Sequence, residues 1–104
     1  MHDFLSMANE AVMFIKSEEN YVQIHYLDKD KTKKFVLRSS MRALEDDLSK
    51  TGLIRCHRSY FINPTYIKIV HRDESGQIVA GLNQNGYDSI PISRNYQDEI
   101  TKLL

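Results

Sequence analysis

Residues 53–63 read Leu53-Ile54-Arg55-Cys56-His57-Arg58-Ser59-Tyr60-Phe61-Ile62-Asn63 and combine apolar residues with a dense group of hydrogen-bond donors. The apolar start predicts a short strand at residues 54–56. Cys56 beside His57 has the residue types of a nucleophile and its base, but neighbours along a strand point to opposite faces. Cys56 is therefore expected to be a small buried hydrophobe. The hydrogen-bond donors of residues 55–60 remain available to bind a polar partner.

Two more polar segments, far apart in the chain, carry similar side chains. Residues 18–21 read Glu-Glu-Asn-Tyr before an apolar strand, and residues 92–95 read Ile-Ser-Arg-Asn at the start of a helical pattern. Arginine pairs bidentately with guanine, and asparagine does so with adenine. Serine and tyrosine hydroxyls, lysines and the N–H groups at helix starts can instead contact phosphates. Each residue alone fits an ordinary surface or turn, but the three segments together favour DNA as the partner.

Outward from this centre, alternation of apolar and polar residues predicts short strands. Val12 and Phe14 are expected on one side of the first strand, and residues 21–27 and 32–37 are expected to form a hairpin. Further strands are predicted at residues 54–56, 67–72, 77–82 and 89–92, with turns at residues 74–76 and 83–86. Because Pro91 lacks an N–H group, the strand that holds it should be very short or lie at an edge.

Two helices interrupt the strands. The first is expected to begin at Ser39 or Ser40, whose hydroxyl suits an N-cap, and to stop at Gly52. The second is expected to begin after Ser93, again as an N-cap, and to continue to Leu104. Asn63, directly before a proline, is expected to hydrogen-bond its own turn and to be structural.

Length and composition indicate one domain over residues 1–104. Hydrophobic residues make up 41% of the chain and charged residues 27%, as in globular domains. No apolar run approaches the ~20 residues that cross a bilayer, no signal peptide follows Met1, and one cysteine forms no intramolecular disulfide. We therefore expect a cytoplasmic protein without membrane contact.

Charge is balanced overall and unevenly distributed. The chain has 14 basic and 14 acidic residues, which by itself argues against a nucleic-acid partner. Residues 31–42 and residues 48–72, however, hold five basic residues each and no acid. Each basic stretch is either a phosphate-binding surface or simply a solvated face.

Motifs for enzyme chemistry are missing from the sequence. The four histidines stand singly, without the spacing of a metal site, and no phosphate loop, dinucleotide fingerprint or nucleophile elbow occurs. We therefore expect a protein that is not an enzyme and that needs no cofactor or metal.

Residues 53–63 resemble the central signature of the LytTR family, in which Arg-Xaa-His-Xaa-Ser is followed by an aromatic residue, an aliphatic residue, Val or Ile, and Asn. Residues 12–22, 35–41 and 90–96 resemble the family's first strand and loop, its strand-to-helix junction and its closing strand and loop. The resemblance covers residues 11–104 and leaves residues 1–10 weakly assigned. It implies a mostly β fold with small α content: an elongated stack of small antiparallel sheets with one central and one C-terminal helix.

The resemblance also implies a function and a set of site residues. Family members are output domains of bacterial transcription regulators that place loops in successive major grooves of DNA. Carried over by position, the base-reading residues are Asn20, Tyr21, Arg58, Arg94 and Asn95. The residues implied to contact the DNA backbone or to order the loops are Arg38, Ser39, His57, Ser59 and Ser93.

The expected partners are promoter repeats in double-stranded DNA, a second copy on an adjacent site, and an upstream receiver or membrane sensory domain if the chain is a fragment. Two other functions stay open from the residues alone. A β-rich protein-interaction module would show an exposed sheet edge and an apolar groove. A hydrolase would need Cys56 or His57 in a pocket beside a third orienting group.

Overall fold

The structure is a computed structural model that describes residues 11–48, 50–82 and 89–103. Its strands are β1 (Val12–Glu18), β2 (Tyr21–Asp28), β3 (Lys31–Arg38), β4 (Ile54–His57), β5 (Tyr60–Ile62), β6 (Ile67–Arg72), β7 (Ile78–Leu82) and β8 (Ile90–Pro91). Its helices are α2 (Met41–Leu48) and α3 (Gln97–Leu103), with 3-10 turns η1 (Pro64–Tyr66) and η2 (Arg94–Tyr96). The predicted mostly β class with two short helices is confirmed.

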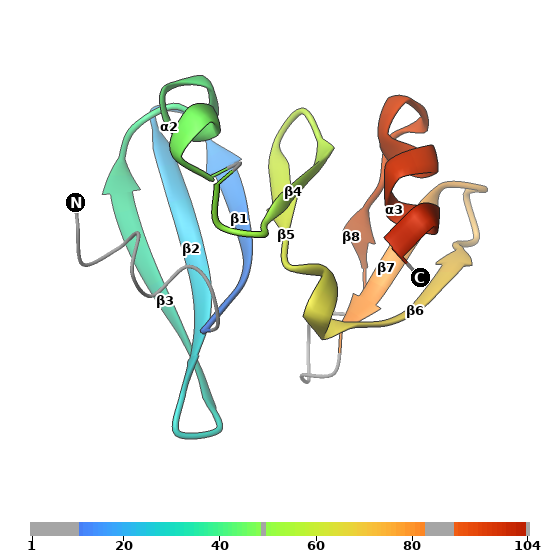
Figure 1. The fold of residues 1–104 in the computed structure, drawn as a ribbon, viewed down its shortest axis with the longest axis horizontal. Helices are drawn as coiled ribbons and strands as arrows, with labels where there is room; N and C mark the ends of the chain where they lie inside the picture. Colours follow the sequence, from blue (N-terminus) through green and yellow to red (C-terminus); the bar gives the residue numbers. More distant parts are fainter. Residues whose placement is uncertain (1–10, 49, 83–88, 104) are drawn as a thin grey trace.

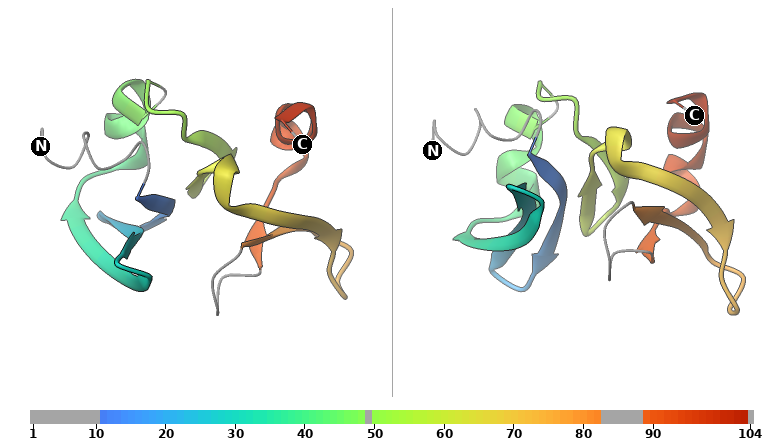
Figure 2. Two further views of the ribbon diagram at one scale, coloured as in Figure 1. Left: turned by 60° about the horizontal axis from the view of Figure 1, so that its bottom comes forward. Right: turned by 90° about the horizontal axis from the view of Figure 1, so that it is seen from below.

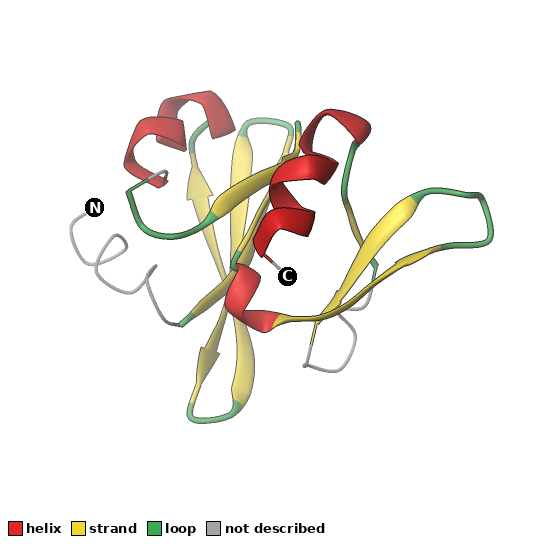
Figure 3. Ribbon diagram, turned by 45° about the vertical axis from the view of Figure 1, so that its right-hand side comes forward, coloured by secondary structure: helices red, strands yellow, loops and turns green. Residues whose placement is uncertain are grey.

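The strands form two antiparallel sheets that lie side by side along the longest axis (Figure 1). The first has the order β3-β2-β1-β5-β4 and the second the order β6-β7-β8. The molecule measures 37 × 29 × 25 Å, which agrees with the expected elongated stack. In both views of Figure 2, α2 lies beside the first sheet and α3 beside the second. Figure 3 shows more strand than helix in the described part of the chain.

The hairpin predicted from the alternation of residues 21–37 is confirmed. β2 pairs with β3 in continuous register from Tyr21–Arg38 to Asp28–Lys31. Lys29 and Asp30 form a two-residue turn with φ values of 52° and 71°, the conformation that matches the twist of the flanking strands. β3 is the outer strand of the sheet, and most of its side chains are exposed.

β1 departs from simple alternation because a β-bulge lies between Val12 and Phe14. The extra residue shifts the phase of the strand, so Val12 joins Ile15 in the first core cluster and Phe14 joins Met13 in the second core cluster. The prediction that Val12 and Phe14 share one side is therefore wrong. The bulge lets β1 contribute apolar residues to both clusters.

Asn63 is structural, as predicted, and it stabilises this bulge as well as its own turn. Its side chain is buried, donates to the Val12 carbonyl at 3.0 Å and accepts from the Thr65 N–H at 3.1 Å. Its backbone N–H donates to the Met13 carbonyl at 2.8 Å. The turn into the second sheet is thereby tied to β1.

The helix termini differ in part from the predictions. The Ser40 hydroxyl accepts from the Ala43 N–H at 3.0 Å, which identifies Ser40 as the N-cap of α2. The helix ends at Leu48, so Gly52, at φ 87°, shapes the following turn and is not the residue that stops the helix. Ser93 makes no side-chain capping bond, and a 3-10 turn precedes α3. In the described part of the chain, no helix is long and apolar enough to cross a membrane.

The second sheet is small and ends in a very short strand. β8 contains only Ile90 and Pro91 and pairs with the inner strand β7, so Pro91 lies at an edge as predicted. The strand is shorter than the predicted residues 89–92. The predicted turn at residues 83–86 lies outside the described residues.

Candidate nucleic-acid interface

The three polar segments singled out in the sequence lie at one edge of the molecule, the upper edge in Figure 1. They are the β1–β2 turn, the β4–β5 turn and η2, and they follow one another along the longest axis. Backbone hydrogen bonds connect them: the Ser17 N–H donates to the Ser59 carbonyl and the Ser93 N–H to the Cys56 carbonyl. Residues up to 75 positions apart in the chain therefore form one row of loops, from Asn20 to Asn95.

The first loop is the two-residue turn of Glu19 and Asn20, with Glu19 at φ 58°. Asn20 is exposed, and its carbonyl accepts from the Ser39 N–H at 3.1 Å. Arg38 is the cross-strand partner of Tyr21, whose exposure is 45%. Four predicted site residues thus meet here, where Asn20, Arg38 and Ser39 line an open concavity of about 360 Å³.

The second loop is the two-residue turn of Arg58 and Ser59 between β4 and β5. The Arg58 side chain is exposed and Ser59 is half-buried. The Ser59 N–H donates to Nδ1 of His57 at 3.1 Å, which requires that this nitrogen be unprotonated. Burial first, and then the Arg58 and Arg55 cations, lower the pKa of His57. A neutral His57 therefore carries its proton on Nε2, where it can donate to an anionic oxygen.

Arg55, from the same signature, is hydrogen-bonded to the backbone of this turn. Its Nε donates to the His57 carbonyl at 3.0 Å and its Nη2 to the Arg58 carbonyl at 2.5 Å. Its Nη1 lies 3.2 Å from Oε1 of Glu45 on α2, and its guanidinium lies over the ring of Phe61, 5.3 Å from the centroid. Arg55 was not among the predicted site residues, although its place at the start of the signature could have indicated it.

The third loop is η2, where Arg94 and Asn95 are exposed and Ser93 is half-buried. Arg94 and Ser93 line a groove of about 300 Å³ together with Arg72 and Gln77 of the β6–β7 hairpin. Arg72 also donates to the Gly76 carbonyl at 2.9 Å. The sequence reasoning missed Arg72, because only the folded hairpin brings it beside η2.

The comparisons with known proteins decide the family. The family model described as the LytTr DNA-binding domain matches residues 3–104. This chain belongs to the LytTR family. BtsR, a transcriptional regulatory protein of Escherichia coli K12, is 32% identical over 93 residues, or 89% of this chain and 36% of BtsR. LytT, a sensory transduction protein of Bacillus subtilis, is 26% identical over 93 residues, or 89% of this chain and 36% of LytT.

The fold agrees with that of a solved LytTR domain. A LytTr DNA-binding domain from Bacillus cereus matches with a TM-score of 0.64 and 24% identity, over 89% of this chain and 80% of that one. This LytTR chain spans about a third of the length of these curated relatives, 36% of each.

In this LytTR domain, the Cys56 thiol is unsuited to nucleophilic chemistry. Its side chain is fully buried, and burial raises its pKa to about 12. Sγ donates to the Tyr60 carbonyl at 3.8 Å, while the backbone carbonyl of Cys56 accepts from Ser93. The prediction of a small buried hydrophobe is confirmed.

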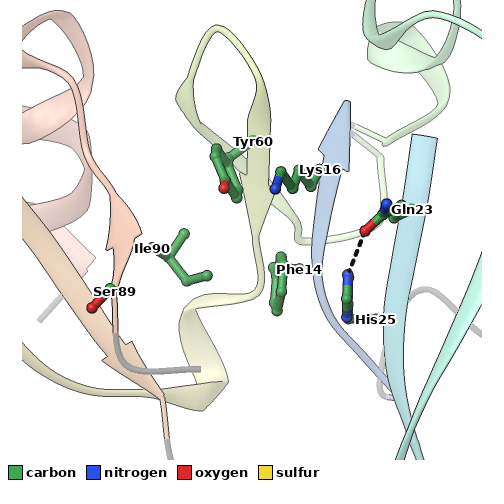
Figure 4. A pocket seen from close by; sticks show the side chains of 7 residues that line it. All are labelled: Phe14, Lys16, Gln23, His25, Tyr60, Ser89 and Ile90. Atoms are coloured by element: carbon green, nitrogen blue, oxygen red, sulfur yellow. Dashed lines mark hydrogen bonds between the residues drawn. The ribbon is translucent and has the colours of Figure 1, made fainter. Parts of the chain in front are cut away.

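A separate cavity of about 250 Å³ lies between the two sheets of the LytTR fold (Figure 4). In Figure 4, Ile90 of β8 points toward Phe14 of β1 across this cavity. His25 stacks on Phe14 with ring centroids 4.2 Å apart, and its Nε2 lies 3.2 Å from Oε1 of Gln23. Burial first, and then the Lys34 and Lys16 cations, lower the pKa of His25 to about 4.

Acid is therefore expected to destabilise the domain through His25. Its folded pKa of about 4 lies below the ordinary value of 6.5, so the unfolded chain binds the proton more tightly. Stability is fully present above pH 6.5 and is lost as the pH falls toward 4. The loss is about 2 kcal/mol, after allowance for partial solvation. Urea unfolding at a series of pH values measures it.

His25→Phe keeps a stacked aromatic ring without the titrating group, so it should make the loss of stability between pH 6.5 and 4 smaller, and the lowered pKa of His57 accounts for a remaining slope. The same change at the exposed His71 is the matched control for the loss of one imidazole. A wild-type curve that is already flat in this window would show that His25 contributes no pH dependence.

Proposed function

We propose that this LytTR domain binds double-stranded DNA sequence-specifically by laying its three loops along one side of the duplex. The observation that carries the proposal is the row of loops at one edge, formed by the β1–β2 turn, the β4–β5 turn and η2 (Figure 1), which carry the exposed side chains of Asn20, Arg58, Arg94 and Asn95. Membership of a family of DNA-binding domains supports it.

The base-reading residues in this proposal are exposed and extend from three different loops. Arg58 and Arg94 have the fork of donors that matches the O6 and N7 acceptors of guanine. Asn20 and Asn95 have the donor and acceptor that match N6 and N7 of adenine. Tyr21, exposed beside Asn20, can stack on a base or donate to a phosphate.

The phosphate contacts in this proposal surround those residues. Arg38 lies beside Tyr21, and neutral His57 presents its Nε2–H near Arg58. Ser39, Ser59 and Ser93 stand where backbone bonds join the loops, so they serve as loop-ordering residues that can also donate to phosphates. Arg72 extends this set beyond η2 because it lines the same groove as Arg94.

The dimensions of the domain support contacts to successive major grooves. One turn of B-DNA advances by about 34–36 Å, and the longest axis of the domain is 37 Å. Laid along a duplex, the domain would therefore cover about one helical turn, which is the repeat of the major groove. The exposed carboxylates of Glu18 and Glu19 beside Asn20 favour base reading over phosphate contact at the first loop.

In this proposal the domain is the output module of a transcription regulator. The name of BtsR, a transcriptional regulatory protein, supports this role. Two copies on adjacent promoter repeats, and a receiver or membrane sensory domain in the same protein, complete the proposed assembly. Cytoplasmic location follows from such a role.

Selection of bound duplexes from a random library tests the proposal directly. Enrichment of one sequence motif is the expected result, and a library that stays random contradicts sequence reading. A salt series gives the second measurement, because affinity falls with a slope of about −0.9 per neutralised phosphate on a log–log plot. Contacts to three or more phosphates predict a slope of about −3 or steeper.

One observation favours the rival function of a protein-interaction module. β3 is an exposed edge strand on which Phe35 and Val36 are 46% and 50% exposed. Lysines at positions 31, 33 and 34 of the same strand oppose pairing with another strand, since charged edges resist edge-to-edge association. Binding that is insensitive to salt and to DNA sequence would favour the rival.

A further inference from the structure

The turn that presents Arg58 lacks the backbone conformation that usually stabilises such a turn. Two-residue hairpin turns favour types with positive φ at one or both central residues. The β1–β2 turn has Glu19 at φ 58°, and the β2–β3 turn has Lys29 and Asp30 at 52° and 71°. Neither Arg58 nor Ser59 has a positive φ. The β4–β5 turn therefore depends on side chains for its conformation.

Arg55 supplies that support from within the same hairpin. Its guanidinium donates to two successive carbonyls, those of His57 and Arg58, which lie on either side of the Arg58 Cα atom. These bonds fix the direction of the backbone from which the Arg58 side chain extends. His57 adds a bond to the other side of the turn, from the Ser59 N–H to Nδ1.

The guanidinium is itself fixed by the first core cluster and by α2. Arg55 is the cross-strand partner of Phe61, and its planar group lies over the Phe61 ring at a distance typical of a cation–π contact. Glu45 of α2 binds the remaining Nη1 at 3.2 Å. The Arg55 side chain is only 19% exposed, whereas that of Glu45 is 50% exposed. Arg55 therefore connects α2 to the turn by charge and hydrogen bonding.

We propose that Arg55, anchored by Glu45 and Phe61, is a positioning residue that sets the Arg58 turn for base reading. The inference rests on the proposed DNA-binding function and deepens it. Arg55 does not touch DNA in this account; it acts through the two carbonyls that it holds. Its planar fork is essential because a lysine ammonium is a single point charge that cannot bond both carbonyls and Glu45 in one plane.

The test compares the base preferences of protein variants, each measured by selecting bound duplexes from a random library. Arg58→Ala first identifies the base pairs that the second loop reads. Arg55→Met keeps the length of the side chain over Phe61 and removes the guanidinium; it should lose most of the preference at those same base pairs, roughly 5- to 150-fold for one bidentate contact. Preferences that depend on Arg94 should remain. Adding Arg55→Met to Arg58→Ala should change the profile little, because the two act as one unit.

Two further variants and one control complete the design. Arg55→Lys should lose the same base preferences as Arg55→Met. If Arg55→Met lowers the folded fraction, Arg55→Lys provides the test in its place. Glu45→Gln should give a smaller loss at the same positions, up to about fivefold, because its carboxylate is half exposed. Lys68→Met removes an exposed cation near the start of β6, outside the three loops, and should leave the profile unchanged.

A measurement without DNA separates this inference from the proposed function. Amide hydrogen exchange at residues 58–60 should accelerate in Arg55→Met while exchange in β1 and β2 stays at wild-type rates. Unchanged exchange in the turn would overturn the inference. So would retention of every base preference, or an equal loss at all positions. A wild-type protein that enriches no sequence would instead refute the proposed function, and the exchange result would show whether Arg55 still orders the turn.

Discussion

Replacing Arg94 with alanine is expected to remove the discrimination of one base pair in the selected DNA site. Arg94 is exposed on η2, and the ion pairs among the described residues, Lys33–Asp28 and Arg55–Glu45, do not include it. Its guanidinium is therefore available to a ligand. A bidentate contact to guanine discriminates by about 1–3 kcal/mol, or roughly 5- to 150-fold in affinity. Competition between duplexes that differ at single positions measures this value.

The fold should be unaffected by this change, since a surface substitution away from the core usually alters stability by no more than about 0.5 kcal/mol. Lys68→Ala is the control for loss of one positive charge, and it should lower neither specificity nor affinity by a comparable factor. An equal loss of affinity for all sequences in Arg94→Ala, with a salt slope reduced by about 0.9, would identify Arg94 as a phosphate contact.

Much of the fold could be predicted because local patterns and tertiary packing agree. The alternation in residues 21–37 fits a hairpin whose inner side chains, Val22 and Ile24, pack in the first core cluster. The edge position of Pro91 follows from the missing N–H of proline, and the role of Asn63 from its preference for local turns. Each of these depends on chemistry within a few residues of the chain.

The errors arose where distant contacts outweigh local preference. The bulge in β1 is invisible in an alternating apolar pattern, because it is stabilised by Asn63, about fifty positions away. Ser93 has the chemistry of an N-cap, yet its N–H is engaged by the Cys56 carbonyl of β4 and its hydroxyl makes no capping bond. Helix α2 ends four residues before Gly52, the expected stop.

For the site, the residue types could be predicted from the sequence, but the contacts between those residues are seen only in the folded structure. The resemblance to the LytTR signature indicated Arg58 and Arg94, which the structure places on neighbouring loops of one edge. It did not indicate that Arg55 would bond two carbonyls of the turn, since those bonds depend on the geometry of a bulged hairpin. Arg72 was missed because the β6–β7 hairpin brings it to η2 only in the folded chain.

The largest effect on stability is expected for Phe61→Ala. Phe61 is 2% exposed, pairs with Ile15 across β1 and β5, and lies in the first core cluster with Leu44 and Leu53. Removing a buried phenyl ring loses its transfer free energy and leaves a cavity, which together cost about 3–5 kcal/mol. A domain of this size has only about 5–15 kcal/mol of total stability, so much of it should disappear. Urea unfolding followed by circular dichroism measures the change.

Phe35→Ala is the matched control, because the same side chain is removed from the same sheet at a position that is 46% exposed. Its loss should not exceed about 1.5 kcal/mol, since about half of the ring already contacts water. Phe61 also supports the Arg55 guanidinium, so Phe61→Leu, which keeps the core apolar but removes the ring, should weaken base preference at the Arg58 positions more than elsewhere. Equal losses for Phe61→Ala and Phe35→Ala would contradict the burial of Phe61 in the first core cluster.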